Sequence, residues 1–237
     1  MLAVTGDTHR EEGRFIYPNM GFEKLGEGDF LCVTGDFGYV WDDSFGERKY
    51  RKMMAEKPYT ICFVDGNHEN FDLLEQYPVE MWKGGKVHVI ERDLRGKPKI
   101  IHLMRGQVYE IEGKKVFTFG GGYSIDVDYR RPHVSWWPQE MPTDDERVEA
   151  IRNLEKHGNK VDFILTHAAP ENIMYRFHRY HESEKPLNNF LQWVRENVQY
   201  QHWYMGHLHS DLDVDEKLTI LLFDVRNMET NESLSDE

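Results

Sequence analysis

Residues 59–69 have the sequence YTICFVDGNHE, in which an apolar run gives way at once to polar side chains. Tyr59–Val64 are apolar or β-branched, and the next five residues supply two carboxylates, an amide, an imidazole and one glycine. Short runs bounded by Gly or Asp are typical of buried parallel strands. Ligands bind beside the carboxyl ends of such strands, so the segment predicts a central strand with a functional site at its end.

The same pattern occurs at four more places in the chain. The apolar runs are Leu2–Thr5, Phe30–Thr34, Val161–Thr166 and His202–Met205, and they are followed by Gly6-Asp7-Thr8-His9, Gly35-Asp36-Phe37-Gly38, His167 and Gly206-His207-Leu208-His209. Side chains two residues apart on an extended backbone point to the same side, so each Asp-x-His or His-x-His pair can hold one metal or two adjacent ones. Asp36, alone on its strand end, suits a carboxylate that bridges two metals. The five ends together offer nitrogen and oxygen ligands without a thiolate.

Helical patterns between these runs predict β-α-β units. Ser44 and Glu47 form a capping-box signal for a helix that Pro58 stops, and Thr143 and Glu146 form a second one. The second helix, ended by Gly158, is expected to face Val148, Ile151 and Leu154 inward. Pro186 begins a third helix with one apolar stripe.

Other segments predict antiparallel strands. Residues 107–111 and 115–119 flank a Glu112-Gly113 turn and form a hairpin signal, residues 86–90 form a further strand, and residues 202–205, 212–214 and 217–223 suggest a closing meander. We therefore predict an α/β fold in four layers, an α/β/β/α sandwich of two mixed sheets with helices outside. Residues 1–228 are expected to form a single domain, and the acidic residues 229–237 a flexible tail.

The charge and the apolar content of the sequence argue against some classes of binding partner. Lys and Arg number 29 against 42 Asp and Glu, for a net charge of −13, so nucleic acid is not expected as a bulk binding partner. A small phosphate ester held by local cations is compatible with this charge. No apolar run approaches the length of a membrane span, and the first residues lack the features of a signal peptide, so we expect no membrane association. Cys32 and Cys62 lie in apolar runs and are expected to be buried free thiols in a reducing cytoplasm. No obligate protein partner is inferred.

The ordered motifs between residues 6 and 209, namely Asp-x-His, Gly-Asp, Gly-Asn-His-Glu, His and Gly-His-x-His, resemble the calcineurin-like metallophosphoesterase superfamily. The resemblance implies the calcineurin-like phosphoesterase fold and a binuclear metal centre. Carried over by position, it implies Asp7, His9 and His209 on one metal and Asn67, His167 and His207 on the other, with Asp36 bridging them. The two divalent ions are expected to be Mn, with Fe, Zn or Ni as alternatives.

The resemblance also implies an activity, the hydrolysis of phosphomonoesters or phosphodiesters by a metal-bridging hydroxide. His68 would be the catalytic residue beside the leaving group; when protonated it would stabilise phosphate oxygens or give up a proton. A nuclease, a phosphoprotein phosphatase and a non-catalytic metal-binding scaffold are the alternatives. Because all seven ligand positions and His68 match the family pattern, catalysis is favoured over the scaffold.

The sequence departs from the family pattern after the second motif. Tyr39 stands where most members have the Asp that orients the catalytic His, so His68 needs another partner. Asp42, Asp43 and Asp65 are the candidates, or there is none. Arg10 after the first His and Tyr39-Val40-Trp41 after the second motif place the chain outside the Ser/Thr protein phosphatase branch.

Substrate binding is expected on residues 120–142, a long loop rich in Gly, Pro, Trp and Arg. Arg130 and Arg131 could clamp a phosphate together with Asn67. Trp136, Trp137 or Tyr123 could stack on a base, or the tryptophans could simply pack the loop onto the sandwich. Residues 175–181, basic and aromatic, are either a second rim of the site or a solvated loop.

Overall fold

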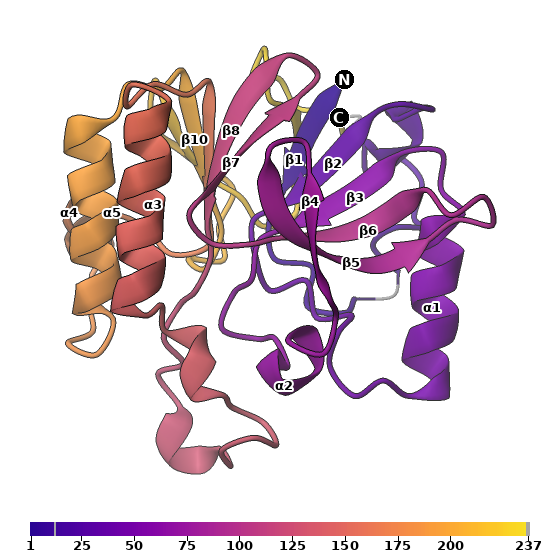
Figure 1. Cartoon of the computed structure of the whole chain (residues 1–237), viewed down its shortest axis with the longest axis horizontal. Helices are drawn as coiled ribbons and strands as arrows, with labels where there is room; N and C mark the ends of the chain where they lie inside the picture. The colour runs from indigo at the N-terminus through magenta and orange to yellow at the C-terminus, as the bar shows by residue number, and fades with distance from the viewer. Residues whose placement is uncertain (12, 236–237) are drawn as a thin grey trace.

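The computed structural model describes residues 1–11 and 13–235, which form two sheets with helices on their outer faces (Figure 1). The first sheet has the order β13-β1-β2-β3-β6-β5-β4, with strands β1 (Leu2–Thr5), β2 (Phe30–Val33), β3 (Thr60–Phe63), β4 (Val79–Trp82), β5 (Gly85–Arg92), β6 (Pro98–Leu103) and β13 (Val225–Asn227). The second has the order β11-β12-β10-β9-β8-β7, with β7 (Gln107–Ile111), β8 (Lys114–Phe119), β9 (Phe163–Thr166), β10 (His202–Met205), β11 (Leu212–Asp215) and β12 (Leu218–Ile220).

Helices cover both outer faces. They are α1 (Phe45–Ala55), α2 (Phe71–Leu74), α3 (Asp144–Lys156), α4 (Glu171–Arg176) and α5 (Lys185–Asn197), with 3₁₀ turns η1 (Phe22–Lys24), η2 (Val127–Tyr129) and η3 (Pro138–Glu140). In Figure 1, α1 lies beside the first sheet, and α3, α4 and α5 lie on the opposite side of the molecule beside the second. The segment that contains η2 and η3 projects away from both sheets (Figure 1).

Three apolar clusters fill the spaces between four layers. Successive side chains of a strand point to opposite faces of the sheet, so they enter different clusters. Leu2 and Val4 of β1 pack in the cluster between the sheets, whereas Ala3 packs in the cluster on the outer face of the first sheet. In the same way, Phe163 and Leu165 of β9 face the other sheet, and Ile164 faces the helices. The predicted four-layer sandwich of two mixed sheets is confirmed.

The parallel strands place the site. β1, β2, β3 and β6 run parallel in the first sheet, and β8, β9, β10 and β12 run parallel in the second. The carboxyl ends of β1, β2, β3, β9 and β10 carry the five motifs. Because the sheets lie face to face, these ends come together at one edge of the sandwich.

The predicted helix starts agree with the structure. The Ser44 hydroxyl accepts the Glu47 N–H at the start of α1, and Thr143 and Glu146 form a complete capping box at the start of α3. The inward face of α3 is partly different from our expectation, since Val148 is 43% exposed while Ala150 and Leu154 are buried. The short side chain of Ala150 allows the helix to pack closely over Gly106, whose position leaves no room for a Cβ beside Ala150.

One further expectation, on the closing segment, is corrected. The closing segment is not a meander, because β12 pairs in parallel with β10 and only the β11–β12 pair is antiparallel. The described part of the acidic tail packs on the fold: Ser233 forms a bridge with Arg226, the Leu234 N–H donates to the Val225 carbonyl, and Leu234 contacts the outer cluster of the first sheet. Residues 236 and 237 lie outside the described residues.

Cys32 and Cys62 are buried free thiols on neighbouring strands, as expected. Across residues 1–11 and 13–235, no helix has both the length and the apolar character that crossing a bilayer requires.

Candidate metal centre

Side chains from all five strand ends meet in two adjoining groups. In the first group, one carboxylate oxygen or imidazole nitrogen from each of Asp7, His9, Asp36 and His209 lies within 4.8 Å of the others. In the second, the Nε2 of His167 lies 3.0 Å from the Asn67 Oδ1 and 3.2 Å from the His207 Nδ1. The structure thus brings together the seven predicted ligands, which are spread over two hundred residues of sequence.

Asp36 lies between the two groups and turns one oxygen toward each. Its Oδ2 is 3.7 Å from the His9 Nε2, and its Oδ1 is 3.5 Å from the His167 Nε2. The same Oδ1 accepts the backbone N–H of His68 at 2.7 Å. The carboxylate is buried, and although burial opposes its charge, the imidazoles of His167, His68 and His9 lower the pKa of Asp36 to about 2.

The backbone at the site is strained in a way that aims these side chains. His9, Asp36, His207 and His209 all have positive φ, between 45° and 64°, a region that non-glycine residues rarely adopt. Glycines allow the close approaches. A Cβ added at Gly206 would lie 2.0 Å from the Asp7 Oδ1, and one at Gly66 would lie 2.1 Å from the Asp36 Oδ1.

The arrangement of donors fits divalent cations. The Nε2 atoms of His9 and His209 face each other at 3.0 Å, as do the His167 Nε2 and His207 Nδ1 at 3.2 Å. The His167 Nδ1 is 2.9 Å from the Thr34 carbonyl, so it carries a proton and leaves Nε2 for a ligand. Burial opposes charge on His167, yet Asp36 and Asp7 raise its pKa to about 10. The buried carboxylates of Asp7 and Asp36 therefore favour a positive charge at the point where the imidazole nitrogens converge.

Glu184 is a site residue that the sequence analysis missed. Its Oε1 lies 3.0 Å from the His207 Nε2, on the side of the ring away from His167, and it also accepts the Tyr123 N–H at 2.8 Å. Burial opposes its charge, but His207 lowers the pKa of Glu184 to about 2. Glu184 directly precedes α5 and belongs to no motif, so no local signal in the sequence points to it.

Ser124 and Glu140 hold the Asn67 amide. The Asn67 Nδ2 donates to the Ser124 Oγ at 3.1 Å, and that hydroxyl donates to the Glu140 Oε2 at 2.8 Å. The amide oxygen is thereby turned toward His167. A carboxylate behind a histidine or an amide fixes the orientation of a ligand, and both ligand types have such support here.

His68 has a partner of the opposite sign from the one we expected. Asp42 pairs with Arg10, Asp43 pairs with Arg51, and Asp65 pairs with Arg105, so none of the three acidic candidates orients His68. Instead, the Arg130 Nη1 and Nη2 lie 3.5 and 3.4 Å from the two ring nitrogens of His68. Burial lowers the pKa of His68; Asp36 acts against this, and the neighbouring guanidinium of Arg130 reinforces it.

A cavity of about 360 Å³ opens beside both groups. Its lining includes Asp36, Asn67, His68, Tyr123, Arg130, Arg179, His207 and His209. Arg131 is exposed and outside this lining, so only the first of the two predicted arginines reaches the cavity. Arg179 lines the cavity as well, so the segment 175–181 contributes to its rim.

The aromatic residues of the loop divide between packing and the cavity. Trp137 is buried against Trp41 and donates its indole N–H to Asp72, so it packs the loop onto the fold. Tyr123 lines the cavity and stacks on His181 with ring centroids 4.6 Å apart.

Comparisons with known proteins agree with this geometry. The sequence profile of the calcineurin-like phosphoesterase family matches residues 1–211. The chain is 26% identical to the lariat debranching enzyme of Mus musculus, with 88% of this chain and 41% of that protein covered. It is 25% identical to the lariat debranching enzyme of Homo sapiens, with 88% of this chain and 42% of that protein covered. The chain therefore spans less than half the length of these curated relatives.

A solved structure supports the fold independently. A candidate 5′-nucleotidase from Staphylococcus aureus, in complex with α-ketoglutarate, superposes with a TM-score of 0.52 over the whole of this chain and 52% of its own, at 12% identity. The curated relatives, which are lariat debranching enzymes, agree with a position outside the Ser/Thr protein phosphatase branch. The profile match over most of the chain shows that it belongs to the calcineurin-like phosphoesterase family.

Proposed function

We propose that the protein is a metal-dependent phosphoesterase that hydrolyses phosphodiesters. The observation that carries the proposal is the position of Asp36, with one oxygen 3.7 Å from His9 and the other 3.5 Å from His167. A carboxylate shared between two groups of nitrogen and oxygen ligands is the arrangement expected of a two-metal site for phosphoryl transfer.

The ligand assignment follows the two groups. Asp7, His9 and His209 would hold one divalent ion, Asn67, His167 and His207 would hold the other, and Asp36 would contact both. Such ions polarise water and offset the charge on phosphoryl oxygens. We expect Mn²⁺ to support activity in an assay, because these ligand types accept several first-row metals and availability decides among them.

The remaining residues bind and orient the ester. Arg130 and Arg179 place guanidinium groups in the cavity lining, where they can pair with phosphate oxygens. The His68 ring lies against the Arg130 guanidinium and lines the same cavity, so it is placed to contact an ester bound there. Glu184 holds the His207 ring, and Ser124 with Glu140 holds the Asn67 amide, so the first contacts to the ions are fixed before they bind.

The names of the relatives support a diester. Lariat debranching enzymes are named for cutting branched molecules, and they match this chain over 88% of its length. The net charge of −13 argues against gripping a long polyanion along its backbone. A branched or short nucleotide diester, held locally by Arg130 and Arg179, satisfies both observations. A nuclease acting on linear chains is the alternative that this reasoning disfavours.

The test is hydrolysis of bis-p-nitrophenyl phosphate and of p-nitrophenyl phosphate with added Mn²⁺, in wild type and in His68→Ala. We expect faster release from the diester, and a large loss in the variant. A branched oligonucleotide compared with a linear one of the same composition then separates debranching from general nuclease activity. Absence of hydrolysis on all four substrates would support a non-catalytic metal-binding protein.

We also propose that the protein works in the cytoplasm. The two buried free thiols, Cys32 and Cys62, support a reducing compartment. Detection of the natural protein in a membrane or secreted fraction would contradict this.

A further inference from the structure

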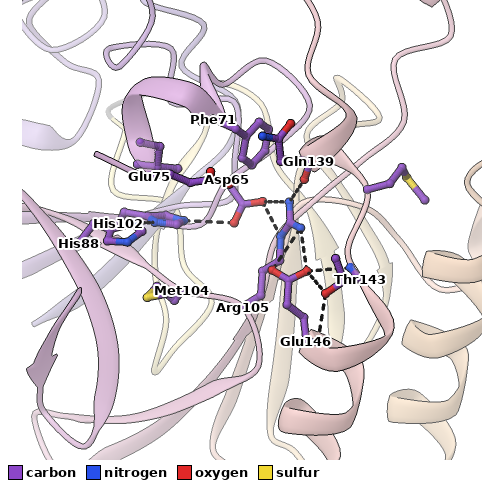
Figure 2. A pocket seen from close by; sticks show the side chains of 12 residues that line it. Asp65, Phe71, Glu75, His88, His102, Met104, Arg105, Gln139, Thr143 and Glu146 are labelled. Atoms are coloured by element: carbon purple, nitrogen blue, oxygen red, sulfur yellow. Dashed lines mark hydrogen bonds and ion pairs between the residues drawn. The ribbon is translucent and has the colours of Figure 1, made fainter. Parts of the chain in front are cut away.

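Arg105 lies on the segment that links the two sheets, between β6 and β7, and is 8% exposed. Its guanidinium touches three parts of the chain at once. Nε and Nη2 lie 2.8 and 2.5 Å from the Asp65 Oδ2, Nη2 donates to the Gln139 carbonyl at 2.8 Å, and Nη1 lies 3.3 Å from a Glu146 oxygen. Figure 2 shows Arg105 between Asp65 and Glu146, with these contacts drawn.

Asp65, the other half of the buried pair, is attached to the start of the long loop. Its carbonyl accepts the Gly121 N–H at 2.9 Å, and a Cβ added at Gly120 would lie 2.4 Å from the Asp65 Oδ1. Arg105 is attached to the end of the same loop through the carbonyls of Gln139 and Glu140. Both stems of the loop 120–142 therefore meet at one buried ion pair.

The ion pair also sits directly before the residues of the candidate centre. Asp65 follows β3, and Asn67 and His68 come two and three residues later. On the opposite side of Asp65, His102 contacts its second oxygen at 3.1 Å. The face of Phe71 covers the guanidinium, with the Arg105 Cζ 5.4 Å from the ring centroid. Both oxygens of the Asp65 carboxylate are thus held, and the ion pair is buried within the fold.

We propose that Arg105 is a positioning residue: it pins both stems of the loop 120–142 to the segment that carries Asn67 and His68, and so sets where Arg130 stands in the cavity. The role as a positioning residue rests on the proposed function, whereas the pinning of the loop does not. A guanidinium is required because it presents donors in several directions within one plane. A lysine can neutralise Asp65 but cannot reach the Gln139 carbonyl and Glu146 at the same time.

The test uses Arg105→Lys in the full-length, metal-loaded protein, with Arg92→Lys as the matched control. Arg92 makes a comparable arginine–carboxylate contact, 2.6 Å to Glu80, but at the exposed edge of the first sheet. Three quantities are measured for each: amide hydrogen exchange by peptide, metal content per chain, and KM and kcat for bis-p-nitrophenyl phosphate.

In Arg105→Lys we expect exchange to rise about 10-fold or more in peptides from 120–142, while α3 and α5 keep their protection. Metal content is expected to be unchanged. KM is expected to rise about 5-fold or more, with kcat changed less than about 3-fold, because Arg130 is displaced without loss of the ligands. Arg92→Lys is expected to match wild type in all three measurements.

Two results would overturn the proposal: unchanged exchange in 120–142, or a rise of equal size in α3 and α5, which would mean a purely structural role. The double variant Asp65→Asn/Arg105→Gln removes both charges, leaves no buried charge unpaired, and serves if the single variant does not fold. In the double variant, too, we expect faster amide exchange in residues 120–142. Exchange as slow as in wild type would also overturn the proposal. The exchange measurement needs no turnover, so an inactive wild type would reject the proposed function while leaving the pinning of the loop open to direct test.

Discussion

The guanidinium of Arg130 lies along the imidazole of His68, with its two terminal nitrogens 3.5 and 3.4 Å from Nδ1 and Nε2. Arg130 is itself held by Asp126, 2.7 Å from its Nε, and by the Ser135 carbonyl. Family members usually place an Asp beside this histidine, and here the position holds Tyr39, which is buried in the core of the first sheet. A cation therefore replaces an anion next to His68, and the pair presents a donor-rich surface to the cavity.

Arg130→Ala tests whether this cation binds the ester. We expect KM for bis-p-nitrophenyl phosphate to rise about 10- to 100-fold, the cost of one or two charge-assisted hydrogen bonds, with metal content unchanged. Arg131→Ala is the matched control because Arg131 is exposed and outside the cavity lining, and it should stay within about 2-fold of wild type. Equal effects of the two substitutions would contradict the assignment.

Asp36→Asn tests the shared carboxylate. The amide keeps the size of the side chain but loses the charge and one of the two oxygens, so metal content should fall at both positions. We expect kcat/KM to drop about 100-fold or more. His209→Ala, which changes the first group alone, should lower metal content by about half as much. Metal analysis after gel filtration distinguishes them, and full stoichiometry in Asp36→Asn would reject the bridging role.

Glu184→Gln tests the support behind His207. The neutral amide no longer favours the ring orientation that turns Nδ1 toward His167, so we expect metal affinity of the second group to weaken about 10- to 100-fold. The first group should keep its metal. Glu182→Gln, two residues away and exposed, is the control. Competition with a metal chelator measures both affinities, and equal retention of metal in the two variants would show that Glu184 is dispensable.

His88 provides a prediction about stability and pH. It faces His102, with their Nδ1 atoms 3.1 Å apart, and Asp65 lies behind His102. Burial, aided by His102, lowers the pKa of His88 from 6.5 to about 4. The unfolded state therefore binds this proton more readily, and the free energy of unfolding should fall as the pH drops from about 6.5 to 4, by up to about 3 kcal/mol.

His88→Gln should reduce that acid sensitivity because the side chain no longer titrates. His157→Gln, which changes a half-buried histidine at the C-terminal end of α3, away from the His88–His102 pair, is the control. Urea unfolding at pH 7 and at pH 4.5 gives the comparison. The same loss of stability on acidification in His88→Gln and wild type would assign the effect to other groups.

The fold and the strand-end side chains are predictable from the sequence because both depend on local signals. Apolar runs ending in Gly and Asp predicted β1, β2 and β3, and the motifs at those ends led to Asp7, Asp36 and Asn67. The edge strand β4 was not anticipated, since Val79 and Met81 are exposed and the segment lacks a buried face. Strand β6 was missed although it lies inside the first sheet between β3 and β5, because it begins with Pro98 and Lys99, and His102 interrupts its short apolar run.

The residues that support the site could not be predicted in the same way. Glu184 lies next to a helix start, where a carboxylate is an ordinary surface residue, and only the folded chain brings it to His207. The family pattern predicts a carboxylate as the partner of His68, whereas the structure has a guanidinium there. Arg130 is 62 residues away along the chain, and its contact depends on how the loop 120–142 folds back.

Four residues of the centre have a left-handed backbone conformation, namely His9, Asp36, His207 and His209. This conformation costs folding free energy but places the side chains that the centre needs. Glycine at His9 or His209, the two exposed positions of the four, would relieve the left-handed strain at the expense of a group that the centre needs. Selection for thermal stability alone would therefore favour variants that are more stable but lack activity. Engineering of this scaffold should screen ion retention alongside melting temperature.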